Sequence, residues 1–205
     1  MLKNKLEFFY LLFLMYQTKA MIPNSNKSSS MCIIKNLDYN NEFLYAYHEP
    51  MEFTLNNNNE RKIYTNPISL KYMKTFDQAE WLFVPTNTQS ETFYIKSPLY
   101  KQWMCASDVN FDLMNKRRKV SMMRIVDDLN KTNMAAFIYA PCMWKLEQLD
   151  KRSNKFVIWN TKYKEPLYAA STMYKTIDSR RNVYTWVNKS PNSKQFIWSI
   201  GCSSH

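Results

Sequence analysis

The chain has 205 residues and a formal net charge of +11, which favours one domain and anionic partners. It contains two histidines and one glycine, so it has little material for a His-dependent triad, a multi-histidine metal site or a glycine-rich phosphate loop. No catalytic constellation, metal site or cofactor motif stands out. We therefore expect a non-enzymatic protein without a cofactor.

The first twenty residues predict a secretory signal peptide, 1–20. Lys3 and Lys5 precede an apolar run over 8–16, and Ala20 supplies the small residue before the cleavage point. The run is about half of the roughly 20 residues that a spanning helix needs, and no second long apolar run follows, so we expect no membrane span.

Residues 21–31 are rich in Ser and Asn, which predicts a flexible leader. Removal of 1–20 takes away three positive charges and one negative charge, so the net charge falls from +11 to +9. The exported chain stays basic. This charge favours sulfated or acidic glycans, acidic proteins or membrane surfaces, whereas nucleic acid is not expected outside the cell.

One pattern of four short segments then occurs three times, over about 32–86, 91–149 and 154–202. From the isoleucine of the first segment to the alanine of the second, the intervals are 12, 11 and 11 residues. The interval before each tryptophan varies, as expected where loops on one face absorb insertions. The segments lie at 32–36, 43–46, 61–64 and 80–83, at 93–97, 103–107, 117–121 and 143–146, and at 156–160, 167–171, 180–184 and 197–200.

The segments alternate apolar and polar residues with period two, which predicts strands. Twelve strands in three pseudo-threefold copies resemble the β-trefoil, an all-β fold, over 32–202. A solenoid of three repeats is the alternative. The resemblance implies a six-stranded barrel from the first and fourth strands of each copy, closed by three hairpins. It places three layers in the core: Ile34, Ile95 and Ile158; Leu44, Met104 and Leu167; and Trp81, Trp144 and Trp198.

The third copy, with the segments 167–170 and 180–186, is similar to small secreted trefoil proteins of flies and mosquitoes. Ricin-type lectins share the architecture more distantly. Their Gln-x-Trp signature is absent here, because Gln78 and Gln195 stand one residue too far from Trp81 and Trp198.

Alignment of the copies within this fold predicts the disulfides. Cys32 and Cys202 correspond to Phe93 and Pro85, which flank the connection between the first and second copies. We therefore expect Cys32 to bond Cys202 where the barrel closes, and Cys105 to bond Cys142.

Arginines recur at a fixed distance from the predicted core residues of each copy. Arg61, Arg118 and Arg181 each precede the third-strand anchor by two residues, and Arg117 and Arg180 add a second charge in two copies. Threefold placement predicts a basic ring that binds sulfate or carboxylate groups. The alternative is that these charges only keep exposed turns soluble.

Sequons predict N-glycosylation at Asn26, Asn130 and Asn188, although Pro191 follows the last sequon. Together these features favour a secreted carbohydrate-binding glycoprotein, or one that binds an extracellular protein. One alternative is a trefoil protease inhibitor acting through the loop from Met122 to Tyr139. The other is a structural or storage protein without a specific ligand.

Overall fold

A computed structural model describes residues 30–39, 41–50, 60–67, 76–86, 91–124, 140–151, 153–173, 180–187 and 193–202. The predicted signal peptide, the sequons at Asn26, Asn130 and Asn188, and most of the Met122 to Tyr139 loop lie outside these residues. Within them, no helix has the length and apolar character needed to cross a membrane.

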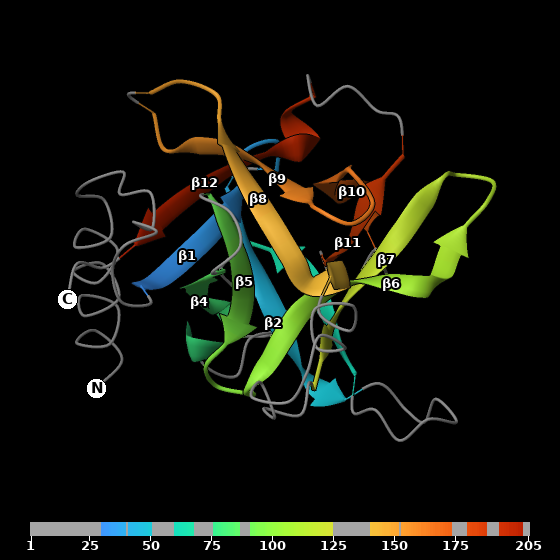
Figure 1. The fold of residues 1–205 in the computed structure, drawn as a ribbon, viewed down its shortest axis with the longest axis horizontal. Helices are drawn as coiled ribbons and strands as arrows, with labels where there is room; N and C mark the ends of the chain where they lie inside the picture. The colour runs from blue at the N-terminus through green and yellow to red at the C-terminus, as the bar shows by residue number, and fades with distance from the viewer. Residues whose placement is uncertain are drawn as a thin grey trace.

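Regular structure in the described residues is β-strand with three short 3₁₀ helices, so the prediction of an all-β fold is confirmed (Figure 1). The strands are β1 (Ser30–Asn36), β2 (Glu42–Pro50), β3 (Arg61–Asn66), β4 (Glu80–Pro85), β5 (Thr92–Ser97), β6 (Gln102–Asp112), β7 (Arg117–Met123), β8 (Met143–Gln148), β9 (Lys155–Asn160), β10 (Glu165–Met173), β11 (Arg181–Trp186) and β12 (Ile197–Cys202). The 3₁₀ helices are η1 (Phe76–Ala79), η2 (Ala140–Cys142) and η3 (Lys194–Phe196).

Six strands pair antiparallel in a closed cycle, in the order β1, β4, β5, β8, β9, β12 and back to β1. Strand β1 begins at Ser30, where it pairs with Phe83 of β4, so the predicted leader is too long at its end by Ser30 and Met31. The first and last strands lie side by side (Figure 1). A chain whose ends meet in this way is not an open solenoid of stacked repeats.

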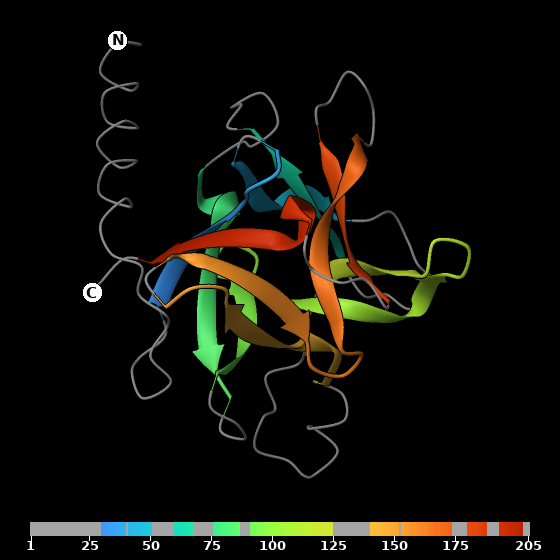
Figure 2. The same ribbon diagram turned by 90° about the horizontal axis from the view of Figure 1, so that it is seen from above.

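The other six strands form the hairpins β2–β3, β6–β7 and β10–β11. Their second strands also pair with one another, β3 with β7, β7 with β11 and β11 with β3. This mutual pairing closes a triangle, which we call the cap. It brings together three segments that lie far apart along the chain (Figure 2).

The predicted core layers are buried. Trp81, Trp144 and Trp198 are 0% exposed, and their indole N–H groups donate to the carbonyls of Leu44, Met104 and Leu167 at 3.0, 2.8 and 3.0 Å. Each tryptophan therefore fills the barrel and ties a barrel strand to the first strand of a hairpin. Ile34, Ile95 and Ile158 belong to the same core cluster.

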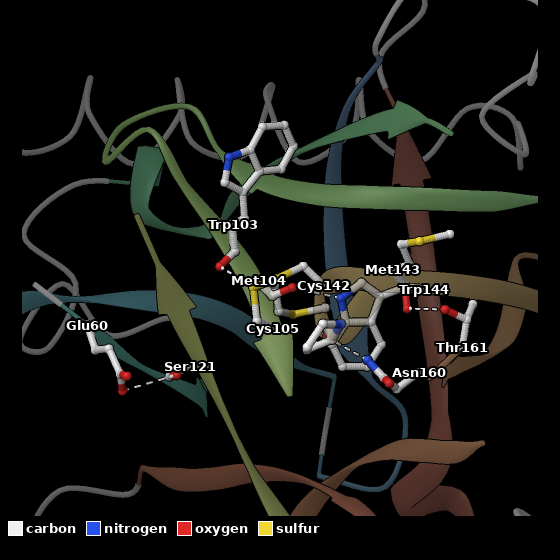
Figure 3. Close-up of a disulfide and its surroundings, with 11 residues drawn as sticks. Glu60, Trp103, Met104, Cys105, Ser121, Cys142, Met143, Trp144, Asn160 and Thr161 are labelled. Atoms are coloured by element: carbon white, nitrogen blue, oxygen red, sulfur yellow. Dashed lines mark hydrogen bonds between the residues drawn. A yellow bond between two sulfur atoms is a disulfide. The ribbon is translucent and has the colours of Figure 1, made fainter. Parts of the chain in front are cut away.

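Both predicted disulfides are confirmed. Cys32 and Cys202 are directly opposed on β1 and β12, with 4.0 Å between their Cα atoms. Cys105 of β6 bonds Cys142 of η2 beside Trp144 (Figure 3). The first bond joins β1 to β12, where the barrel closes. The second holds η2 against the β6–β7 hairpin.

Removing the first disulfide should cost more stability than removing the second, because it spans 170 residues rather than 37. The chain-entropy model gives about 5 kcal/mol for Cys32→Ala with Cys202→Ala and about 4 kcal/mol for Cys105→Ala with Cys142→Ala. Urea unfolding of both double variants measures the difference. A larger loss for the second pair would show that its local role on η2 outweighs chain closure.

Candidate functional site: the arginines of the cap

Successive side chains of a strand point to opposite faces, so the position of each cap arginine along its strand determines which way it faces. On β3, Arg61 lies on the same side as Ile63, which is part of the barrel core. Arg118 and Arg181 stand in the same relation to Val120 and Val183. The three arginines therefore face the core end of the cap.

Arg118 forms a bidentate ion pair with Glu165, the first residue of β10. Its Nε and Nη2 atoms donate to the two carboxylate oxygens at 3.2 Å each, and Nη1 donates to the carbonyl of Ser107 at 2.9 Å. The guanidinium also lies 3.6 Å from the ring centre of Tyr163. Only 12% of this arginine side chain is exposed, so it is a structural link between two hairpins.

Arg181 makes the corresponding contacts with the first hairpin. Its Nε atom donates to Glu42 at 3.1 Å, Nη1 donates to the carbonyl of Ser171, and the guanidinium lies 3.6 Å from the ring centre of Tyr39. Burial raises the pKa of Glu42, while the hydrogen bond from Thr65 at 2.6 Å and the charge of Arg181 oppose this rise.

Arg61 differs from the other two because it forms no ion pair with a carboxylate among the residues that the structure describes. Gln102 stands at the start of β6, where β2 and β10 start with glutamate. Arg61 donates to the carbonyl of His48 at 2.5 Å and lies 4.0 Å from the ring centre of Tyr100. Within the described chain its Nε atom has no hydrogen-bond partner.

The residue before each of these arginines faces the other way. Arg180 lies 4.6 Å from the ring centre of Tyr47, and Arg117 lies 4.5 Å from that of Tyr184. Arg117 also pairs with Asp112 at 3.0 Å. Burial raises the pKa of the neighbouring Tyr168 to about 12, against the lowering effect of Arg117.

In the first copy the corresponding residue is Glu60. Its carboxylate accepts a hydrogen bond from Ser121 at 3.4 Å (Figure 3). Ser121 occupies the position on β7 that Tyr64 and Tyr184 hold on β3 and β11. The residue before the core-facing arginine is therefore an arginine where the neighbouring hairpin presents a tyrosine ring. It is a glutamate where that hairpin presents the hydroxyl of Ser121.

The glutamines of the Gln-x-x-Trp segments support the stacked tyrosines. Gln78 donates to the hydroxyl of Tyr100 at 2.9 Å and to the carbonyl of Ala46 at 3.2 Å. Gln195 donates to the hydroxyl of Tyr39. These side chains hold the platforms on which Arg61 and Arg181 rest.

The three cap strands β3, β7 and β11 carry six basic residues and no acidic one. Carboxylates pair with Arg117, Arg118 and Arg181. Lys119 is half-buried, and its pKa is lowered by burial and by the charge of Lys62, although Glu60 opposes the shift. We name Lys62, Arg117 and Lys119 the basic cap surface.

The sequence predicted that the arginines come together, but it did not reveal their partners. The sequence did not predict the roles of Glu42 and Glu165, because each pairs with an arginine from another copy of the pattern, 139 and 47 residues away. One signal was present: a residue two positions from a core anchor on a strand shares its face. Whether the five arginines bind a ligand stays a prediction.

No family model matches the chain, and no curated protein matches it. Solved structures do. A salivary protein of Culex quinquefasciatus from the Cysteine and Tryptophan-Rich family is 18% identical with a TM-score of 0.53, over 88% of this chain and 97% of its own. The SDF2-like protein of Arabidopsis thaliana is 13% identical with a TM-score of 0.59, over 84% and 92%.

A structure described as the BEL beta-trefoil is 14% identical with a TM-score of 0.54, over 88% of this chain and 98% of its own. The chain shares the β-trefoil fold. The predicted resemblance to the trefoil superfamily, mosquito proteins included, is thus confirmed for the fold. At these identities the likeness extends to the fold alone, and a trefoil supports many unrelated activities.

Replacing Gln102 by glutamate should stabilise this trefoil, because it supplies Arg61 with the carboxylate that Arg118 and Arg181 have. Charge-assisted hydrogen bonds of this kind contribute about 1.5 to 3 kcal/mol, less the cost of burying the new charge. We expect a gain of about 1 kcal/mol for Gln102→Glu and a loss of about 3 kcal/mol for Glu165→Gln in urea unfolding.

Glu91→Gln is the matched control. Glu91 pairs with Lys145 at 3.8 Å on the surface, where the contribution to stability is below about 1 kcal/mol. A destabilised Gln102→Glu variant would show that Arg61 is already satisfied by backbone carbonyls and Tyr100.

Proposed function

We propose that this chain is a secreted, non-enzymatic binding protein that recognises an anionic glycan or an acidic extracellular protein through the basic cap surface. Its twelve strands would form three pseudo-threefold repeats, about 32–86, 91–149 and 154–202. Two kinds of contact support this repetition. Each tryptophan makes the same indole bond, and each core-facing arginine stacks on a tyrosine of another repeat.

Secretion is supported by the apolar N-terminal segment and by the two disulfides, which are typical of oxidising compartments. The same export route would allow N-glycosylation at Asn26, Asn130 and Asn188. The disulfides also suit a protein that must keep its shape outside the cell.

The observation that carries the ligand class is the concentration of positive charge on the cap. Pairing of β3 with β7 brings Lys62, Arg117 and Lys119 to one face of the cap. Lys62 and Lys119 face away from the core, opposite to Ile63 and Val120. A positive surface of this kind attracts sulfate and carboxylate groups.

The five predicted arginines then divide by role. Arg117 is partly exposed on the outward face, so we assign it contact with the anion, together with the two lysines. Arg61 faces the core end and stacks on Tyr100, so we assign it the task of holding the cap in shape. Arg118, Arg180 and Arg181 have buried or nearly buried side chains, so we assign them the same task.

Retention on immobilised heparin tests this function. Lys62→Ala with Lys119→Ala should weaken heparin binding about fivefold to tenfold, since each exposed ionic contact contributes up to about 1 kcal/mol. The control removes the same charge from the barrel wall with Lys145→Ala and Lys155→Ala, both exposed on β8 and β9. Equal elution salt for both double variants would mean that the cap is not the binding surface.

A further inference from the structure

The β6–β7 hairpin projects from the body in both views, where it is drawn in yellow-green (Figures 1 and 2). Strand β6 is the longest, with 11 residues. The turn at its end carries Leu113 and Met114, whose exposed fractions are 80% and 94%. Two adjacent apolar side chains thus point into solvent at the far end of a projecting element.

This exposure has no explanation within the described fold. Turns of this length normally hold Asn, Asp, Gly, Ser or Pro. The other large apolar residues exposed among the described ones, Leu99 and Leu149, are 43% and 45% exposed. The turn therefore displays apolar area that the hairpin does not need for its own stability.

The backbone of the turn is held by the chain itself. The Asp112 carboxylate accepts the Asn115 N–H at 3.1 Å and the Asn115 side-chain amide at 2.8 Å, and Arg117 donates to it at 3.0 Å. The carbonyl of Lys116 accepts the N–H of Val187 at 2.9 Å. The hydrogen bonds from Asn115 also hold the pKa of Asp112 below its usual value.

These hydrogen bonds lower the free-energy cost of moving the turn from water into an apolar environment. A polar backbone group that leaves water without a partner carries a large free-energy penalty, and here the N–H of Asn115 and the carbonyl of Lys116 are already bonded. A turn that is ordered before binding also loses little conformational entropy on binding.

The surroundings of the tip favour a lipid surface over a protein pocket. Leu113 and Met114 are flanked by Asp112, Asn115, Lys116 and Arg117, so the apolar area is limited to two side chains. A stable protein interface needs about 800 Å² on each partner. A bilayer requires no matching shape, and its acyl boundary accepts any apolar projection.

We propose that the β6–β7 hairpin is a peripheral membrane anchor, which inserts Leu113 and Met114 into the interfacial region of an anionic phospholipid bilayer. Lys116 lies beside the tip, is exposed and would meet the lipid phosphates. The net positive charge of the chain favours the same anionic surface. The attachment would be weak and reversible, because two side chains bury less apolar area than a lipid anchor. This inference does not depend on glycan binding by the cap.

Vesicle co-sedimentation of the disulfide-bonded chain tests the anchor. We expect binding to vesicles of phosphatidylcholine with phosphatidylserine and much weaker binding to phosphatidylcholine alone. Leu113→Ser with Met114→Ser should lower the partition coefficient at least about tenfold. Leu99→Ser with Leu149→Ser removes two exposed leucines elsewhere and should leave it unchanged.

A second variant tests the opposite direction. Met114→Trp should raise the partition coefficient about threefold or more, since tryptophan favours the membrane interface. The tip variants should keep the wild-type unfolding midpoint and heparin retention, which separates this inference from the proposed function. If the wild-type chain does not sediment with anionic vesicles, or if the serine variant sediments equally well, the tip is not a lipid anchor.

Discussion

The cap depends on guanidinium groups that reach from one hairpin to another. Pairing of β3, β7 and β11 in a triangle leaves three strand starts packed closely, and each supplies an arginine to a neighbouring copy. Arg118 and Arg181 each combine a carboxylate, a backbone carbonyl and a tyrosine face. A lysine has neither the planar face nor the forked donors for this combination. The hairpins therefore cannot move independently, and the barrel is closed at this end.

The second copy departs from this arrangement in a coordinated way. Gln102 and Met122 stand where the other copies have a glutamate and a threonine that bond each other. Cys105 takes the position of Tyr45 and Tyr168, and its disulfide to Cys142 holds η2 where Tyr168 packs on Phe196 of η3. A covalent bond thus replaces an aromatic contact. Within the part of the chain that the structure describes, the position that lacks the glutamate of an ion pair and the second disulfide belong to the same copy.

In the proposed function, ligand binding and stability depend on opposite faces of the same strands. Arg61, Arg118 and Arg181 face the core end, while Lys62 and Lys119 face outward. Because alternate residues on a strand point to opposite sides, one short basic segment would serve both purposes. This separation explains why repeated arginines by themselves do not identify a binding surface. A structural contact that recurs in each copy of the pattern also makes a charged residue recur in each copy.

The sequence by itself determined the strand pattern, the tryptophan core and both disulfides. These follow from the spacing of the pattern together with the β-trefoil fold that it resembles, in which Cys32 and Cys202 lie where the first and last strands pair. Only the tertiary structure decided the partners of the arginines. Glu42 meets Arg181 from 139 residues away, so no local rule links them. The exposure of Leu113 and Met114 also needed the fold, because apolar residues in a sequence normally indicate burial, and only their place on a projecting hairpin leaves them in solvent.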